Sequence, residues 1–485
     1  MKPLVTLLIT FITAAGCARH STTVPSPQSG PVSSPAPGLP AARGVISEAS
    51  VRGHMEFIAS DALNGRGSGT RDEWIAATYF GAQMRRWGIE PLGDAGGYVK
   101  AVEIERQEIT AAPVLTFPGG RLTHGKEMLV QSLNGAKLAG PLQKLQSGTP
   151  MTPGAIVLLP QTPSPAAPGM PGTTAGAAAV LRVETEQDRA RWATAAARMP
   201  TVPARVVGVQ PAVPGRAISI ALDKASYAAL SVLADGAPIT IEADLKPGQK
   251  SYTWNAMGRI TGNDPAAAGE VILLTAHLDH LGNRTAPGTV AAGTTAATDT
   301  IYNGADDDAS GSVAVLELAE ALARGPRPKR TIIFTWFGSE EAGGYGARYF
   351  IDRPPVPLDR IVANLEFEMI ARPDPKVPPH TLWLTGYERS NLGPELARQG
   401  AKIVQDPHPD QNFFSRSDNI QLARRGVIAQ TVSSFGLHAE YHQPSDEVRF
   451  VDFAHMTESI RSMLEPVRWL ANSSFKPAWL PGKKP

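Results

Sequence analysis

The chain has 485 residues, of which 42% are hydrophobic and 19% are charged, as in soluble globular proteins. Its 46 Lys and Arg residues nearly cancel its 45 Asp and Glu residues, so no global basic field favours nucleic acid as a partner. This length exceeds what one ordinary core fills, and we therefore expect two domains with additional segments.

The N-terminus resembles an export signal. Lys2 precedes an apolar run at residues 4–15, which is shorter than the roughly 20 residues that span a bilayer. Small residues then lead into Cys17, as in bacterial lipoprotein signals whose cysteine becomes the lipidated first residue. We expect residues 1–17 to be such a signal, the protein to be exported, and Cys17 to be its only membrane contact. The alternative is a cleavable secretory signal that happens to contain a cysteine. In either case no second cysteine exists for a disulfide or a thiolate metal site.

Composition divides the rest of the chain. Residues 18–44 are rich in Ser, Pro and Thr without hydrophobic periodicity, which predicts a flexible linker. Helical spacing of apolar residues then predicts helices at 47–60 and 71–87. Residues 111–249 contain short β-like runs between Pro/Gly clusters, which indicates a β-rich inserted domain. The clearest of these runs are at 155–159, 177–183 and 218–222.

From Trp254 onwards, apolar runs of strand length alternate with amphipathic helices. The predicted strands are 271–276, 331–337, 361–367, 381–384 and 427–432. The predicted helices are 310–324, one that begins near Glu340, and 453–470. This alternation predicts an α/β fold with a mostly parallel central sheet flanked by helices, and we assign residues 45–110 and 250–475 to that domain.

Carboxylates and histidines follow the ends of these predicted strands, where α/β sheets form their sites. They are His277, Asp279, Asp306, Asp307, Asp308, Glu340, Glu341, Glu366, Glu368 and His442. Each alone has an ordinary explanation, since carboxylates near helix starts favour the helix dipole. Together, two histidines and several carboxylates without cysteine suit zinc. A shared carboxylate could hold two ions about 3.5–4 Å apart.

Five motifs in order carry a specific resemblance: AHLDHLG, GADDDASGSVAVLELAEAL, FTWFGSEEAGGYGARYF, NLEFEM and YHQPSD. Together they resemble the di-zinc aminopeptidase family, which includes bacterial leucyl aminopeptidases, glutamate carboxypeptidase II, glutaminyl cyclases and the transferrin receptor. The resemblance covers most of residues 254–470. It implies a metallopeptidase that holds two Zn²⁺ ions and hydrolyses peptides.

The same resemblance implies a metal-ligand set. His277 would bind one zinc, Asp307 would bridge both, and Glu341 and His442 would bind the second. Glu368 stands where many members have aspartate and would join His277. The less favoured alternatives are Glu366 in place of Glu368 and His438 in place of His442. His442 is preferred because Tyr441 and Asp446 flank it as in the family motif. The family also implies a cis peptide bond between Asp307 and Asp308.

Three further roles follow from the resemblance. Asp279 would orient His277, Glu340 would be the general base, and Tyr441 would donate to the oxyanion. Two positions depart from the common pattern, because Asn419 replaces a histidine in the segment FFSRSDN, and His280 replaces a serine.

The resemblance extends to function and to the inserted segment, whose GAIVLLP stretch is similar to a strand of protease-associated domains. We expect a zinc aminopeptidase acting on peptide substrates. The alternatives are a glutaminyl-cyclase-like acyltransferase, which typically uses one zinc, a carboxypeptidase with the same metal centre, and a non-catalytic binding protein like the transferrin receptor.

Overall fold

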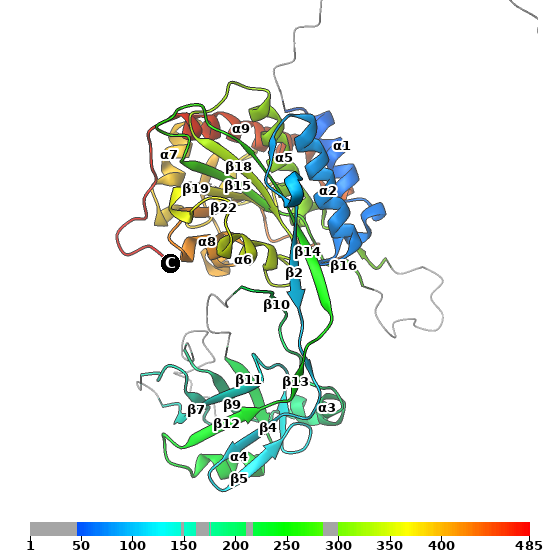
Figure 1. Ribbon diagram of the computed structural model, residues 1–485, viewed down its shortest axis with the longest axis vertical. Helices are drawn as coiled ribbons and strands as arrows, with labels where there is room; N and C mark the ends of the chain where they lie inside the picture. The colour runs from blue at the N-terminus through cyan, green and yellow to red at the C-terminus, as the bar shows by residue number, and fades with distance from the viewer. Residues whose placement is uncertain (1–45, 147–149, 162–173, 175, 210–216, 285–298) are drawn as a thin grey trace, which may run out of the picture. The chain divides into compact units, whose positions relative to one another are not determined.

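The computed structural model describes residues 46–146, 150–161, 174, 176–209, 217–284 and 299–485. They form helices and β-sheets in a mixed α/β fold, as predicted from the sequence (Figure 1). The predicted signal at 1–17, including Cys17, and the whole linker at 18–44 lie outside the described residues, as does residue 45. Within the described ranges, no helix has both the length and the apolar character that crossing a bilayer requires.

The main sheet has the strand order β10-β2-β14-β18-β15-β19-β22-β20-β21, with β1 beside β14. Its strands are β1 (Glu90–Pro91), β2 (Val99–Glu105), β10 (Arg205–Val206), β14 (Lys250–Ile260), β15 (Val271–His277), β18 (Thr331–Phe337), β19 (Ile361–Phe367), β20 (Leu382–Leu384), β21 (Ile403–Gln405) and β22 (Ala429–Ser433). The central strands β18, β15, β19 and β22 are parallel. Their carboxyl ends therefore meet along one edge of the sheet, where ligand sites of α/β folds form.

Outside this centre the sheet is mixed, where sequence analysis expected a mostly parallel one. β14 pairs antiparallel with both β2 and β18, and β22 pairs antiparallel with β20. The chain leaves the sheet after β2, touches it again with the short strand β10 beside β2, and returns to it fully along β14. Two neighbouring strands joined by such an excursion pair like the arms of a hairpin, so they run antiparallel. No strand was predicted from the sequence for either segment.

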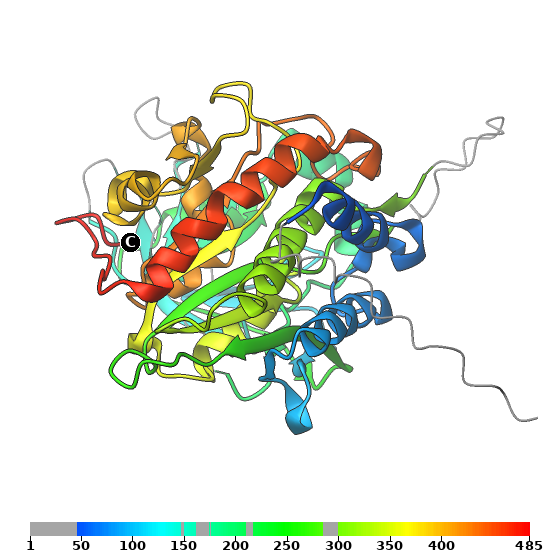
Figure 2. The same cartoon turned by 90° about the horizontal axis from the view of Figure 1, so that it is seen from above.

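The helices are α1 (Glu48–Ile58), α2 (Arg71–Arg86), α3 (Glu186–Ala196), α4 (Lys224–Ser231), α5 (Gly311–Ala323), α6 (Tyr345–Asp352), α7 (Leu392–Arg398), α8 (Asn419–Arg424) and α9 (Phe453–Asn472). Two apolar clusters cover the main sheet. Ile272, Leu274 and Ala276 of β15 belong to the cluster that contains α1, α2, α5 and α9. Val271 and Leu273, which alternate with them, belong to the cluster that contains α6 and α8. Since successive strand residues point to opposite faces, helices cover both faces of the sheet, and Figure 2 shows α9 alongside α5 on one of them.

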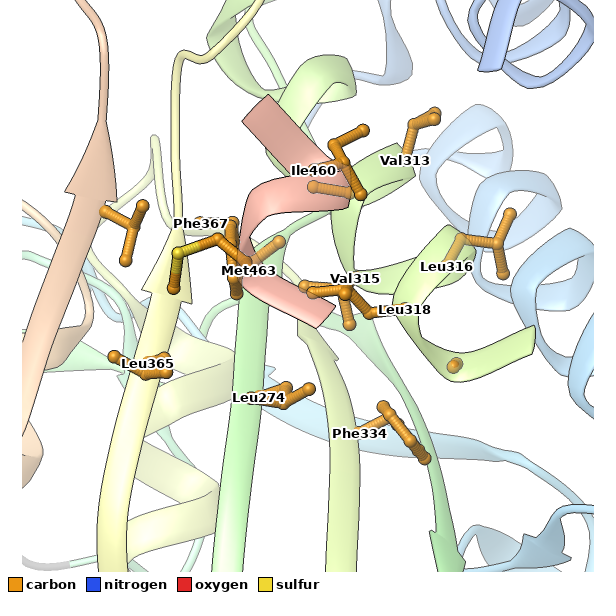
Figure 3. Close-up of a cluster of buried hydrophobic side chains, with 14 of the residues drawn as sticks. Leu274, Val313, Val315, Leu316, Leu318, Phe334, Leu365, Phe367, Ile460 and Met463 are labelled. Atoms are coloured by element: carbon orange, nitrogen blue, oxygen red, sulfur yellow. The ribbon is translucent and has the colours of Figure 1, made fainter. Parts of the chain in front are cut away.

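Helix α5 lies in the middle of the larger cluster. Its sequence GSVAVLELAEALA is apolar on nearly every side, which is typical of a fully buried helix. In Figure 3, Val315 and Leu318 of α5 and Met463 of α9 lie against Leu274 and its strand neighbours. Each such buried side chain contributes roughly 1.5–3 kcal/mol to stability. This packing fixes the N-terminus of α5 at the carboxyl edge of the sheet.

A second sheet has the order β5-β4-β12-β7-β8-β9-β11-β6. Its strands are β4 (Val114–Phe117), β5 (Gly120–Thr123), β6 (Met128–Val130), β7 (Lys137–Lys144), β8 (Ile156–Leu158), β9 (Ala179–Val183), β11 (Ile218–Leu222) and β12 (Pro238–Glu242). These strands share an apolar cluster of their own. Two short pairs complete the strands: β3 (Glu108–Ile109) with β13 (Leu245–Lys246), and β16 (Gly282–Asn283) with β17 (Ile301–Tyr302). The described residues nevertheless group as one compact unit, so the domain limits at 111–249 stay a prediction.

One predicted element boundary is wrong in a way that matters for the site. The helix expected to begin near Glu340 begins at Tyr345 instead. Gly343 and Gly344 adopt positive φ angles of 122° and 67°, a conformation that interrupts a helix. Glu340 and Glu341 therefore lie in a turn between β18 and α6 rather than on a helix.

Candidate metal centre

The first group of potential metal ligands contains His277, Asp307 and Glu368, whose donor atoms lie within 4.8 Å of one another. His277 is the last residue of β15, and Glu368 directly follows β19. The Nε2 atom of His277 is 3.2 Å from Oδ1 of Asp307 and 3.9 Å from Oε1 of Glu368. Two parallel strand ends and the loop before α5 thus bring three predicted ligands to one point.

The second group contains His280, Asp307 and Glu341, and His442 adjoins it. Nε2 of His442 is 3.1 Å from Oδ2 of Asp307 and 3.3 Å from Oε1 of Glu341. Nδ1 of His280 is 2.8 Å from the same oxygen of Glu341. Asp307 belongs to both groups, with one carboxylate oxygen directed to each, which is the geometry that a bridging ligand requires.

Hydrogen bonds explain why the middle residue of the acidic triplet is the available one. The carboxylate of Asp308 accepts the backbone N–H groups of His277 at 3.2 Å and Met369 at 3.1 Å. The carboxylate of Asp306 accepts the N–H of Ala371 at 2.8 Å and also contacts His438. The peptide bond between Asp307 and Asp308 is cis, as the resemblance implied. The flanking carboxylates therefore tie the loop to neighbouring strands, and that of Asp307 is left to face the histidines.

Asp279 lies beside His277, as predicted, but its carboxylate makes different contacts. Nδ1 of His277 lies 3.2 Å from the backbone oxygen of Asp279 and 3.8 Å from its carboxylate. That carboxylate accepts the N–H groups of Glu340 at 2.9 Å and Glu341 at 3.3 Å, and the hydroxyl of Ser68 at 2.5 Å. The backbone oxygen of Asp279 thus contacts His277, and the side chain of Asp279 binds the turn that carries Glu340 and Glu341.

Several carboxyl groups with little exposure to solvent lie close together around Asp307. Burial raises the pKa of Glu340 well above its usual value, and it raises the pKa values of Glu368 and Asp418 to about 7. Burial also lowers the pKa of His442, but contacts with Asp307 and Glu341 outweigh that effect and raise it to about 9. So much buried acidity at one place favours a bound cation.

Two of the alternatives left open by the sequence have clear positions. Glu366 accepts the backbone N–H of Asn419 at 2.6 Å and the hydroxyl of Thr431 at 3.3 Å, so its carboxylate serves the neighbouring strand and helix. His438 contacts Oδ2 of Asp306 at 2.8 Å rather than Asp307. Glu368 and His442, by contrast, lie in direct contact with the two donor groups.

Tyr441 lies at the edge of the centre. Its ring stacks on that of His442 with centroids 3.9 Å apart, and its hydroxyl accepts from Arg416 at 3.3 Å. Burial raises the pKa of this phenol, so it keeps its proton at neutral pH and can donate it in a hydrogen bond.

Arg66, which is 1% exposed, is a site residue that was not predicted from the sequence. Its guanidinium donates to four backbone oxygens, those of Ile58, Leu278, Asn303 and Gly304, at 2.6–3.1 Å. It thereby joins the loop after β15 to the loop that carries Asp307. Burial lowers its pKa to about 10, so it remains charged at neutral pH. A lone arginine between two predicted helices gives no sequence signal for such a role.

The donor atoms themselves fit a metal. Within the described ranges, Nε2 of His277, Nδ1 of His280 and Oε1 of Glu341 are buried and have no hydrogen-bond partner of acceptable geometry. Buried polar atoms normally have partners, so each unpaired one calls for an explanation, such as an ion. Imidazole nitrogens and carboxylate oxygens are ligands that zinc accepts. The residues present therefore fit a pair of metal ions.

An edge of parallel strands that gathers two adjoining donor groups is the architecture of an α/β metallohydrolase. Residues 255–466 match the family model described as Peptidase family M28, and this segment contains every predicted metal ligand. The chain thus fits the di-zinc aminopeptidase family that its motifs resemble, and that prediction is confirmed.

Two curated relatives match shorter stretches. Leupeptin-inactivating enzyme 1 of Streptomyces exfoliatus is 40% identical over 81 residues, 16% of this chain and 18% of that protein. An aminopeptidase of Pseudomonas aeruginosa (strain UCBPP-PA14) is 31% identical over 129 residues, 26% of this chain and 20% of that protein. The matched part of the chain thus spans about a fifth of the length of these two relatives. Among solved structures, BSAP, a zinc aminopeptidase from Bacillus subtilis, matches with a TM-score of 0.47 and 18% identity, over 88% of this chain and 96% of that chain.

Proposed function

We propose that the protein is a zinc-dependent aminopeptidase that removes N-terminal residues from peptides. The observation that carries this proposal is Asp307, whose two carboxylate oxygens each face a separate histidine at 3.1–3.2 Å. In this assignment His277, Asp307 and Glu368 would hold one zinc, and Asp307, Glu341 and His442 would hold the other. When bound, zinc supplies Lewis acidity, which polarises a carbonyl and makes water a better nucleophile at neutral pH.

In this mechanism Glu340 moves the proton. Its carboxyl group lies near the charges of His277, Glu341 and Glu368, and burial raises its pKa well above its usual value, which favours a group that both takes up and returns a proton. The carboxylate takes a proton from the attacking water and then delivers it to the nitrogen of the leaving amine. The Asp279 side chain fixes the backbone of Glu340 for this transfer through its 2.9 Å hydrogen bond.

Tyr441 has a supporting role in the proposal. The phenol keeps its proton, since burial raises its pKa, and it lies on the ring of His442. It donates a hydrogen bond to the oxygen on which negative charge develops, an effect that is worth most where donors are fixed in advance. Its contact with Arg416 at 3.3 Å helps to hold it in place.

The name of one relative supports attack at the amino terminus, and the paired donor groups support a two-metal enzyme over the cyclase and the non-catalytic alternatives. The Pseudomonas aeruginosa relative is named an aminopeptidase. A cyclase-like site that uses one zinc would have no need of two overlapping donor groups, and a non-catalytic relative would have no need of either.

The segment at 111–249, proposed to resemble a protease-associated domain, has its own sheet and core.

The experiment that tests the proposal is hydrolysis of aminoacyl-nitroanilides and of one peptide with either a free or an acetylated N-terminus. We expect release from the free terminus only, lost after chelation and restored by zinc. Release from the acetylated peptide would instead support a carboxypeptidase. Pyroglutamate formation from N-terminal glutamine, without hydrolysis, would support the cyclase.

We also propose that the protein is exported and anchored through lipidated Cys17, on the strength of the signal-like run before it. Lipidation needs the thiol, so Cys17→Ser is expected to move the protein from the membrane fraction to the soluble exported fraction. Equal membrane association of the variant and the wild type would refute the anchor.

A further inference from the structure

We infer that His280 is a direct ligand of the second metal ion, in addition to His442, Glu341 and Asp307. This inference rests on the proposed two-metal function and goes beyond the family pattern, in which this position commonly holds serine. It adds a third imidazole to the pair of ions.

The first support is the position of the ring. Nδ1 of His280 lies 2.8 Å from Oε1 of Glu341 and 3.9 Å from Oδ2 of Asp307. The donor atoms of these three residues lie within 4.8 Å of one another, as do those of His277, Asp307 and Glu368. By this measure His280 relates to the second group as His277 relates to the first.

The second support is the absence of hydrogen bonds where they would be expected. Although Nδ1 of His280 and Oε1 of Glu341 are close, neither has a hydrogen-bond partner of acceptable geometry among the described residues. Nε2 of His277, a ligand in the proposed function, shows the same combination of closeness and missing partner. Lone pairs of donors that converge on an ion point at the ion rather than at each other. Two ligands of one metal ion are therefore expected to place a nitrogen and an oxygen close together without the alignment of a hydrogen bond.

The third support is that the His280 ring is fully buried and tightly packed. His280 is 0% exposed, so it neither contacts solvent nor offers itself to a large substrate. Its backbone N–H donates to the oxygen of Arg66 at 3.0 Å. Its ring packs against Gly304, where an added Cβ would lie 2.5 Å from Cγ of the imidazole. Both ring nitrogens of His280 are buried without a hydrogen-bond partner among the described residues, and a metal bound through Nδ1 would use the one that faces the carboxylates.

The test is X-ray absorption spectroscopy of the full chain loaded with zinc, in which imidazole rings give a characteristic outer-shell signal. The wild type is expected to take up two ions that share three imidazoles, those of His277, His280 and His442. His280→Asn is expected to show two. The matched control is His438→Asn, because His438 faces Asp306 and not the donor groups, and it should leave the imidazole count at three.

A second readout is zinc affinity measured by competition with a chelator. Residues that only orient metal ligands already cost roughly 10- to 100-fold in affinity, so we expect His280→Asn to weaken the second ion at least about tenfold. Circular dichroism of the chelated proteins checks that the variant folds, and the wild-type spectrum alone gives the imidazole count if it does not.

The outcomes separate this inference from the proposed function. Two ions with two imidazoles in the wild type would overturn the role of His280 as a ligand while the two-metal function stands. If His280→Asn then also weakened zinc binding, His280 would only position Glu341. Failure of the wild type to take up two ions would overturn the proposed function itself.

Discussion

Asp446 holds the backbone of Asp307: its carboxylate oxygen Oδ2 accepts the Asp307 N–H at 3.1 Å. The same carboxylate accepts the N–H of Asp306. Asp446 is 0% exposed and follows His442 by only four residues. The short segment 442–446 therefore supplies His442 to the second group of metal ligands, and it also fixes the loop that carries Asp307, the ligand common to both groups.

Loss of this contact should weaken metal binding. We expect Asp446→Ala to lower zinc affinity roughly 10- to 100-fold, the usual cost of removing a residue that orients a metal ligand. Zinc competition with a fluorescent chelator measures this. Asp374→Ala is the matched control, because Asp374 is an equally buried aspartate whose carboxylate instead binds Trp383 at 3.0 Å and His408 at 2.7 Å. Equal affinity of Asp446→Ala and the wild type would refute the positioning role.

Glu340 should be needed for turnover and not for metal. In Glu340→Gln the amide cannot accept the proton of water, so we expect kcat to fall by about 10²- to 10⁴-fold with zinc content unchanged. Steady-state kinetics and elemental analysis of the same sample check both parts. Glu48→Gln, at a half-exposed position on α1, controls for the chemical change. Undiminished kcat would exclude Glu340 as the base.

The core between β15 and α5 should respond strongly to cavities. Leu274 is 0% exposed and packs among the residues shown in Figure 3. Leu274→Ala is expected to lower the free energy of unfolding by about 2–5 kcal/mol, since lost transfer energy and a cavity both contribute. Val232→Ala, at a position that is 81% exposed, should change it by no more than about 0.5 kcal/mol. Chemical denaturation measures both, and similar losses in the two variants would contradict the packing described.

Glu317 on α5 should make stability depend on pH. Burial raises its pKa from 4.5 to about 7, and Oε1 lies 3.7 Å from Nε2 of His54, whose own pKa burial lowers. Because the folded state binds this proton more tightly, its contribution is fully present below about pH 4.5 and is lost as the pH rises through about 7. The shift corresponds to about 3 kcal/mol.

Glu317→Gln should therefore be more stable than the wild type at about pH 8, and the difference should shrink towards about pH 5. Denaturation of both proteins at the two pH values measures it. A difference that does not change with pH would show that Glu317 titrates normally in the folded protein.

The sequence predicted well the strands at the centre of the main sheet and β11 of the second sheet, because each is a mostly apolar run. β18, β19 and β11 have the predicted limits, and the other predicted strands shift by only a few residues. β2 and β14 were missed because their polar residues alternate with apolar ones and their pairing joins segments far apart in the chain. The start of α6 was misplaced because the conformation of Gly343 and Gly344 depends on the turn around them.

In the candidate site, too, some features could be predicted from the sequence and others could not. Its acidic and histidine residues could be predicted from the sequence because they follow strand ends, where side chains of an α/β sheet converge. The supporting contacts could not. Arg66 and Asp446 act on backbone groups of other segments, and such contacts exist only once the loops are packed. His280 differs from the family pattern, so a resemblance alone gave it no role.

Anomalous diffraction at the zinc absorption edge, from crystals of the zinc-loaded protein, tests the central claim most directly. The account predicts two peaks on either side of the Asp307 carboxylate, one beside His277 and Glu368 and one beside Glu341 and His442. No peak at Asp307, or a single peak that leaves one of these groups without an ion, would contradict it.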